Sequence, residues 1–553
     1  MMLNYYNILA LLLLIVCNRC LCDLCKTCVC SVSNAGPIID CHDRHLGTNQ
    51  VLEFDLITLD QHRSLNKLIL AKNHIALLPI NELKNLKHLK NLDLSQNQLD
   101  NIHLDIFKHI NALEDLNYSH NLLSDFDFSI LNTASSLSRL NLSHNQISNL
   151  KKSSENTTTK LTVLDVSHNN LSNLNFFDVL TELINLDLSF NKLTILPADS
   201  LLYLQHLKIL RINNNRLLSL DLQNLPLSLS ELYAESNLIN ALSLQKSSIC
   251  ILNIQENHIS NVHKNLTLLN KLKSLNISGN FLSDFPDVSL KNIEMLDLSF
   301  NNLTIIPETV SLKNFPNLKI FHISGNHLKD IKIRSELKLE RFEVNFVETI
   351  EEIDEQTFLL LRERTNGCIN VTVSRNTKLS TIEENVFQHM NICSLDLSYN
   401  RFTHLPSKLF KNFNNENISN TKYLINLQGN PFICNCSLQW MLNELIPILY
   451  TTKPSLLDDL RCAGPPQLIN KRMIHWYNWK GEVFCDDFSH LMEKMTVENI
   501  ASVSNKQVVT FETSLGMIVV LATATAVLAI LTIIGIFLTR RIIVKRRRIN
   551  RRF

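Results

Sequence analysis

Three histidines recur at one position of a regular sequence pattern, and such a set could bind a metal ion or titrate near neutral pH. His120, His144 and His168 each stand directly before an asparagine, at intervals of 24 residues. If these positions stack, the imidazoles form a column about 5 Å apart that could hold a divalent cation or gain charge below about pH 6. Gln96 and Phe190 fill the same position on either side. We therefore favour the simpler interpretation, a solvent-exposed position that carries varied residues.

Aspartates recur at a second position of the pattern, between two apolar residues. Carboxylates in pairs can act as general acid and base. These appear wherever the pattern appears, however, which indicates a structural origin: Asp93, Asp165, Asp187, Asp297 and Asp396. No Ser-His-Asp or Cys-His arrangement and no Gly-rich phosphate loop stands apart from the pattern. The sequence predicts neither catalysis nor a cofactor.

The elements that must position these side chains are short repeats. The stretches LDLSQNQL, LNYSHNLL and LNLSHNQI align on their asparagines. The aligned positions are Asn73, Asn97, Asn121, Asn145, Asn169, Asn191, Asn215, Asn237, Asn257, Asn280, Asn301, Asn326, Asn376 and Asn400. Phe342, Val344 and Val347 fit a further repeat that has lost its asparagine, and Leu424–Asn430 fits a last one. Self-similarity of this kind is typical of leucine-rich repeats.

The spacing of apolar residues predicts how each repeat folds. In each L-x-L stretch the flanking residues, such as Leu140 and Leu142, should point inward and the residue between them, Asn141, outward. One short strand per repeat then stacks on the next about 4.8 Å away, in a long parallel sheet. The buried asparagine must bond backbone groups of neighbouring repeats. The expected fold is an α/β solenoid, a leucine-rich repeat horseshoe of about 15 to 16 repeats with a cap at each end.

Cysteines cluster at both ends of the array. Cys434 and Cys436 form a C-x-C motif followed by Cys462 and Cys485. This arrangement, with Trp440 nearby, resembles the cysteine-rich C-terminal cap of extracellular leucine-rich repeat proteins. The resemblance implies the pairs Cys434–Cys462 and Cys436–Cys485. Four cysteines could instead bind zinc, but disulfides are favoured in a secreted ectodomain.

The N-terminal cysteines resemble the matching N-terminal cap less closely, and their pairing stays open: Cys25, Cys28, Cys30 and Cys41. Cys22 could join them if the leader is cleaved earlier. Cys368 and Cys393 lie on consecutive repeats, yet the alignment puts Cys368 opposite Ile392, one position out of step, which argues against a bridge. Cys250 could form an intermolecular link, but a buried free thiol is favoured.

Two apolar segments indicate the topology. Ile8–Val16 has the length of a signal-peptide core, and 515–538 is long enough to cross a bilayer. Eight Lys or Arg residues follow within 540–553, so the positive-inside rule predicts a type I single-pass plasma-membrane protein with its N-terminus extracellular. The expected divisions are 1–22 signal peptide, 23–50 N-terminal cap, 51–430 repeats, 431–486 C-terminal cap, 487–514 juxtamembrane linker, 515–538 transmembrane helix and 539–553 basic tail.

The formal net charge of +1 includes that basic tail, so the rest of the chain is mildly acidic. A nucleic-acid-binding protein usually presents a basic body. The sequence therefore predicts no nucleic-acid partner.

Glycosylation sequons occur along the whole repeat array. We expect sugar at Asn117, Asn141, Asn156, Asn170, Asn265, Asn276, Asn302, Asn370 and Asn417, whereas Asn435 lies between two bridged cysteines and should stay bare. Asn117, Asn141 and Asn276 fall at the outward position of their strands, on the concave face. Glycans on the first two would shift protein binding to the flanks or to later repeats. There the outward position reads Arg211, Tyr233 and Asn253, and arginine and tyrosine are favoured interface anchors.

Together these features resemble the ectodomains of Toll-like receptors and of leucine-rich repeat cell-adhesion proteins, over about residues 25–486. The resemblance implies a cell-surface receptor or adhesion protein that binds an extracellular protein or a second copy on another cell. The residues after the predicted span are too few for a Toll-type signalling domain, so any signal is expected to pass through a co-receptor. The alternative is an innate-immune co-receptor that presents microbial ligands to a separate signalling receptor.

Overall fold

The computed structural model describes 24–47, 64–78, 83, 86–102, 107–151, 159–174, 180–197, 201–364, 367–414, 424–479 and 481–485. All of these residues belong to one compact unit, Met1–Cys485. The predicted signal peptide, transmembrane helix and basic tail lie outside the described residues. Among the helices that are described, none has both the length and the apolar character needed to span a bilayer.

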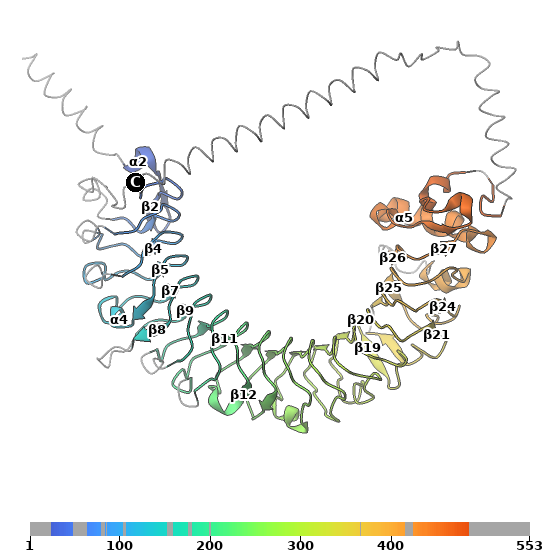
Figure 1. Cartoon of the computed structure of the whole chain (residues 1–553), viewed down its shortest axis with the longest axis horizontal. Helices are drawn as coiled ribbons and strands as arrows, with labels where there is room; N and C mark the ends of the chain where they lie inside the picture. Colours follow the sequence, from blue (N-terminus) through green and yellow to red (C-terminus); the bar gives the residue numbers. More distant parts are fainter. Residues whose placement is uncertain are drawn as a thin grey trace, which may run out of the picture. The chain divides into compact units, whose positions relative to one another are not determined.

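One 18-stranded sheet runs through the unit. Its strands are β1 Val29–Ser33, β2 Gly36–Asp40, β3 Lys67–Ile69, β4 Asn91–Asp93, β5 Asp115–Asn117, β7 Arg139–Asn141, β9 Val163–Asp165, β10 Asn185–Asp187, β11 Ile209–Arg211, β13 Glu231–Tyr233, β15 Ile251–Asn253, β16 Ser274–Asn276, β17 Met295–Asp297, β18 Ile320–His322, β20 Arg341–Glu343, β23 Ile369–Thr372, β25 Ile392–Asp396 and β26 Leu424–Asn426. Only β1 and β2 pair antiparallel; from β2 onward each strand pairs parallel with the next in this order. In Figure 1 the sheet follows the inner side of the curve that this unit forms.

The register of the sheet follows the predicted alternation. Leu140 pairs in register with Leu116 on one side and Leu164 on the other, and all three side chains are buried. The residues that flank each buried leucine within the strand are mostly half-buried and form the exposed face of the sheet, which we call the inner face. Side chains on the inner face are therefore stacked in columns, one residue per repeat.

The recurring asparagines form a buried ladder that joins consecutive repeats. Asn97 is typical: its Nδ2 donates to the carbonyl oxygens of Leu70 (2.9 Å), Leu94 (2.9 Å) and Ser95 (3.1 Å). Its Oδ1 accepts from the backbone N–H groups of Asn73 and Ile75, each at 3.0 Å. A single asparagine side chain thus satisfies backbone N–H and C=O groups of two repeats. These groups take no part in the pairing between strands.

One repeat lacks this asparagine, as the sequence predicted. Phe342, Val344 and Val347 are fully buried in the repeat that contains β20. The Val347 side chain cannot hydrogen-bond, but its backbone N–H still donates to Oδ1 of Asn376, at 2.8 Å. The ladder of hydrogen bonds therefore continues through this repeat, because the asparagine of the following repeat supplies the acceptor.

The outer side is built from short irregular segments rather than regular helices. Short parallel pairs lie there: β6 Asp125–Asp127 with β8 Asn149–Lys151, β12 Ser219–Asp221 with β14 Ala241–Ser243, β19 Leu337–Leu339 with β22 Leu361–Glu363, and β21 Glu352–Ile353 with β24 Thr381–Ile382. Helical segments of the repeats that the structure describes in full are α4 Ile130–Thr133 and the 3₁₀ turns η4 Leu222–Asn224, η5 Lys264–Leu268 and η6 Ser407–Asn414. The described residues thus form a β-solenoid instead of the predicted α/β solenoid, because their return segments carry only short helical turns, of which η6 is the longest.

Disulfides close both ends of the described unit. In the N-terminal cap, which includes α2 Leu24–Thr27, Cys25 bonds Cys30 and Cys28 bonds Cys41. In the C-terminal cap the bonds are Cys434–Cys462 and Cys436–Cys485, the pairing that the resemblance implied. The elements of this cap are β27 Phe432–Ile433, η7 Cys436–Leu438, η8 Met441–Leu445, α5 Ile446–Thr452, η9 Pro454–Leu457, β28 Cys462–Gly464, η10 Pro466–Leu468 and η11 Met473–Trp476.

The expectation against a Cys368–Cys393 bridge was wrong. The structure bonds these two residues, whose Cα atoms lie 5.2 Å apart. Ile369 pairs with Ile392, but Asn370 pairs with Ser394, so Cys393 is an extra residue in β25. This bulge removes the one-position mismatch that the alignment had indicated. Cys250 is free, although half-buried rather than fully buried.

Gly325 offers a direct test of the packing between repeats. It has φ +64°, and a Cβ atom there would overlap the Phe300 ring of the preceding repeat. We expect Gly325→Ala to lower the free energy of unfolding by about 2 kcal/mol, because alanine resists this backbone conformation and displaces the ring. Gly367→Ala is the matched control, since its nearest neighbour would be Arg364 O at 3.6 Å. Equal denaturation midpoints for the two variants would contradict this packing.

Candidate functional site on the inner face

Aspartate or asparagine at the last strand position of most repeats performs a structural task. We call this position the inner-face slot. The slot side chain accepts a hydrogen bond from the backbone N–H two residues later, as Asp93 does from Ser95 (2.9 Å) and Asn141 from Ser143 (2.9 Å). The same bond recurs at Asn117, Asp165, Asp187, Asn253, Asn276, Asp297, Asp396 and Asn426. The periodic aspartates therefore cap the turn that ends each strand.

Arg211 and Tyr233 interrupt this series at neighbouring strands. They face each other in the register of β11 and β13, and the Arg211 guanidinium carbon lies 5.1 Å from the centre of the Tyr233 ring. Arg211 also donates to Oδ1 of Asn185 (3.2 Å), and the Tyr233 hydroxyl donates to Glu231 (3.1 Å). Neither side chain can accept the turn N–H. The two repeats therefore lack the hydrogen bond to the turn N–H and carry instead a preorganised, half-exposed cation–π pair.

Glu235 lies beside this pair, and the burial of its carboxylate is poorly compensated by hydrogen bonds. One of its carboxylate oxygens is buried and has no hydrogen-bond partner among the described residues. Burial is the main cause that raises the pKa of Glu235, the carboxylates of Glu256 and Asp187 add to it, and Arg211 acts in the opposite direction. Burial and Glu231 likewise raise the pKa of the Tyr233 hydroxyl. This carboxylate was not among the predicted site residues, although it replaces the serine that most repeats carry at this position.

The raised pKa of Glu235 predicts a pH-dependent effect on stability. A carboxyl group whose pKa is higher in the folded chain than in the unfolded chain destabilises the fold when it is ionised. The destabilisation is complete at pH values above the folded pKa, and it is absent at pH values below the unfolded pKa of about 4.3. We therefore expect Glu235→Gln to raise the melting temperature at pH 7 and the difference to shrink towards pH 4. Glu348→Gln, at an exposed residue of another repeat, is the control. A Glu235→Gln effect that is equal at both pH values would contradict the prediction.

Asn253, the third predicted ligand-binding residue, lies next to Tyr233 in register on β15. Unlike Arg211 and Tyr233, Asn253 keeps the structural role of the slot, since its Oδ1 accepts from Gln255 N at 3.3 Å. The structure therefore brings the three predicted residues together but divides them by role. Arg211 and Tyr233 are available for contact, and Asn253 forms the edge of their surface.

A second interruption of the slot was missed by the sequence interpretation. His322 on β18 lies between the carboxylates of Asp297 (3.5 Å) and Glu343 (3.7 Å), and its side chain is 18% exposed. Burial acts to raise the pKa of Asp297, but hydrogen bonds from His322 and Ser299 lower it. The signal was present in the sequence, because His322 and Glu343 depart from the slot's Asp or Asn just as Arg211 does.

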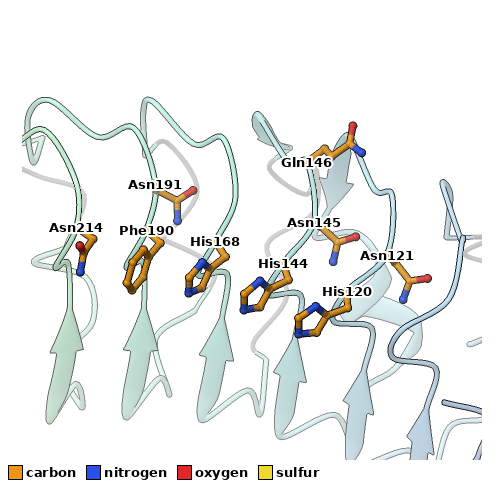
Figure 2. Close-up of a pocket in the computed structure, with 9 residues that line it drawn as sticks. All are labelled: His120, Asn121, His144, Asn145, Gln146, His168, Phe190, Asn191 and Asn214. Carbon is orange, nitrogen blue, oxygen red and sulfur yellow. The ribbon is translucent and has the colours of Figure 1, made fainter. Parts of the chain in front are cut away.

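The histidine column is confirmed as a stack and lies in a second slot, directly before each ladder asparagine. His120, His144 and His168 have φ angles of 55°, 53° and 52°. The ring centroids of successive histidines are 4.0 and 3.9 Å apart, and Phe190 stacks on His168 at 4.0 Å. Figure 2 shows the four rings in one row, one from each consecutive repeat, above the ends of the strands.

The described sequons fall on several parts of the solenoid. Asn117, Asn141 and Asn276 lie on β5, β7 and β16, half-buried in the inner-face slot. Asn370 is on β23, Asn265 in η5, and Asn170 and Asn302 each directly follow a ladder asparagine. Asn435 is exposed beside the bridged Cys436. Asn156 and Asn417 lie outside the described residues.

Known families and proteins share this architecture. Leucine-rich repeat models match 63–123 and 391–413, and a model of two leucine-rich repeat copies matches 291–338. The solved structure of a TLR13–ssRNA13 complex aligns with a TM-score of 0.58 and 18% identity, over 79% of this chain and 63% of that one. The chain thus carries a leucine-rich repeat solenoid similar to receptor ectodomains. The likeness to the TLR13 chain concerns the fold alone.

Curated relatives match parts of the chain. Human oligodendrocyte-myelin glycoprotein is 34% identical over 149 residues, covering 26% of this chain and 33% of that protein. Mouse Toll-like receptor 7 is 24% identical over 302 residues, covering 52% of this chain and 26% of the receptor. The chain spans less than half of the length of the curated relatives it matches.

Proposed function

We propose that this chain is a cell-surface recognition protein that binds a protein ligand through its inner face and does not catalyse a reaction. The observation that carries the proposal is the exchange of the slot's structural side chains for Arg211 and Tyr233. Each exchange gives up a hydrogen bond worth about 1 kcal/mol. A solenoid that needed only stability would keep aspartate or asparagine there, so contact with a partner is the better explanation.

The sequons define where a partner has room. Glycans on Asn117 and Asn141 would cover the inner face over β5 and β7, and a glycan on Asn276 would stand over β16. The five strands between them, β9 to β15 in the sheet order, leave a window of roughly 24 Å at 4.8 Å per strand. Arg211 and Tyr233 lie inside this window. A compact protein surface fits that width.

The proposed location is the plasma membrane. Structural disulfides persist in oxidising compartments, and the described residues contain five. The apolar run 515–538 and the basic residues after it remain the basis for proposing a type I single-pass topology. In this arrangement the inner face is presented outside the cell.

Cell aggregation tests the proposal. The full-length chain is expressed on non-adherent cells, which are mixed with differently labelled cells that lack it. Clusters that contain only expressing cells would support homophilic adhesion. Mixed clusters would indicate a partner on the other cells. Absence of any clustering, despite surface display, would contradict adhesion as the function.

The second candidate is an innate-immune co-receptor that presents microbial ligands to a separate signalling receptor. The similarity to mouse Toll-like receptor 7 over 52% of the chain favours it. Binding of fluorescent microbial lipid or glycan to expressing cells, without cell clustering, would support this candidate over adhesion. A chain that clusters cells but binds neither would exclude it.

A further inference from the structure

A column of mostly aromatic residues follows the rim of the last repeats. It occupies the slot directly before the ladder position, the same slot that holds the histidine column in earlier repeats, and every residue in it has a positive φ angle. In the repeats of β17, β18, β20, β23, β25 and β26 this slot reads Phe300, Gly325, Phe346, Arg375, Tyr399 and Gly429. We call these residues the rim strip. Five strand spacings of about 4.8 Å give it a length of roughly 24 Å.

The two glycines of the rim strip make room for the rings of the preceding repeats. A Cβ atom at Gly325 would overlap the Phe300 ring, and one at Gly429 would overlap the Tyr399 ring. Across Gly325 the ring centroids of Phe300 and Phe346 lie 6.0 Å apart. Phe300, Phe346 and Tyr399 nevertheless remain 54%, 48% and 43% exposed. Single exposed aromatic residues are common, but a continuous set of this kind is typical of an interaction surface.

Arg375 places one positive charge between two of these rings. Its guanidinium carbon lies 4.6 Å from the centre of the Tyr399 ring and 5.8 Å from the centre of the Phe346 ring. The side chain is exposed, and among the described residues its guanidinium has neither an ion pair nor a hydrogen bond. Contact with aromatic rings holds a guanidinium in place, while its N–H groups stay free to donate. A carboxylate is the group that accepts two of these N–H groups at once.

We propose that the rim strip binds an extended acidic peptide segment of a partner protein, at a surface separate from the inner-face slot. A carboxylate of the peptide pairs with Arg375, and its apolar side chains lie across the rings of Phe300, Phe346 and Tyr399. An extended segment of about seven residues spans roughly 23 Å, which matches the length of the strip. A nucleic-acid strand carries a phosphate about every 3.4 Å, and one cation in the whole strip does not match that charge density.

A pocket at the end of the rim strip favours the same kind of ligand. It has a volume of about 650 Å³, and Tyr399 of the rim strip, Arg401 and Ile469 are among the residues that line it. Asp459 on its wall is paired with Arg461 (2.9 Å), which leaves Arg401 as the cation of the pocket without an ion pair among the described residues. Ile469 is exposed and apolar. The pocket therefore accepts a second carboxylate together with an apolar side chain.

Peptide selection on the purified full-length chain tests the proposal. The probe is a phage-displayed library of random octapeptides, and peptides whose binding is lost in Arg211→Ala/Tyr233→Ala are set aside as ligands of the inner face. We expect the remaining enriched peptides to carry Asp or Glu among aromatic and aliphatic residues. Their dissociation constants are then measured by fluorescence anisotropy. Arg375→Gln should weaken binding about tenfold or more, because it removes a charged hydrogen-bond donor.

Lys378→Gln is the matched control, because it removes an equal charge from an exposed residue of the same repeat outside the slot. Binding to this variant should stay within about twofold of the parent chain, since an isolated surface charge contributes little. Arg375→Glu should lose the acidic peptides and bind versions in which lysine replaces their acidic residues. Equal losses in Arg375→Gln and Lys378→Gln, enriched peptides that lack an acidic residue, or no enriched peptides at the rim strip would each overturn the proposal.

Discussion

Replacing Arg211 and Tyr233 together by alanine will weaken ligand binding about 100-fold and leave surface display unchanged. The two side chains form one cation–π pair on the exposed inner face, and each is of a type that contributes about 2 kcal/mol or more as an interface anchor. Anchors in contact are not additive, so we expect about 3 kcal/mol in total, which corresponds to this factor. The measurement is the concentration of partner protein that half-saturates expressing cells, with a second copy of the chain as the partner if adhesion is homophilic.

The control for this variant is Asp396→Ala. Asp396 occupies the same inner-face slot, on β25, and accepts from Ser398 N (2.9 Å) the structural hydrogen bond that Arg211 and Tyr233 do not make. It lies outside the window between the sequons of β7 and β16. We expect binding to be unchanged in this variant. If Asp396→Ala weakens binding as much as the double alanine variant does, the effect does not depend on position within the window, and the binding surface is not at Arg211 and Tyr233.

The largest effect on stability is expected from the asparagine ladder. Asn145 donates to the carbonyls of Tyr118 (3.0 Å), Leu142 (3.0 Å) and Ser143 (3.2 Å) and accepts from Leu123 N (3.0 Å). Asn145→Leu keeps the size of the side chain but leaves four buried backbone groups without this partner. Since each unsatisfied group costs about 1 to 3 kcal/mol, partly relieved by water, we expect a loss of about 4 kcal/mol in the free energy of unfolding.

Gln146→Leu is the matched control for the ladder, because Gln146 is the next residue of the same repeat and is exposed. Its side chain should contribute within about 0.5 kcal/mol, as surface positions usually do. Denaturant unfolding of both variants, read by far-ultraviolet circular dichroism, gives the comparison. A ladder variant as stable as the control would mean that the buried asparagine does not hold the repeats together.

The sequence predicted the parts of the fold that depend on periodicity. The buried leucines, the ladder asparagines and the repeat around Val347 follow from side-chain alternation and from the need to satisfy buried backbone groups. It did not predict the Cys368–Cys393 bond, because a one-residue bulge in β25 changes the register without changing the repeat spacing. Nor did it predict short turns on the outer side, where each return segment packs according to its own length and apolar content.

The candidate site was predicted only in part for a similar reason. Alignment placed Arg211, Tyr233 and Asn253 in one column, but the direction of a long side chain within that column depends on its neighbours. The stacking of Arg211 on Tyr233 and the buried carboxylate of Glu235 emerge from those contacts. The cluster of Asp297, His322 and Glu343 was missed because those residues were compared with a consensus rather than with one another.

A new glycan at Asn253 provides the most direct test of the central claim, that the inner face around Arg211 and Tyr233 binds the partner. Gln255→Thr places a threonine two residues after Asn253 and so creates a sequon in the slot next to Tyr233, as nature has done at Asn141. The double variant Asn253→Gln/Gln255→Thr carries the same threonine without the acceptor. Occupancy is read as an endoglycosidase-sensitive mass shift.

We measure aggregation of expressing cells for both variants at matched surface display. The predicted result is that Gln255→Thr, with its glycan attached, abolishes aggregation, while the double variant aggregates like the parent chain. Full aggregation with the Asn253 glycan in place would contradict the assignment of the binding surface.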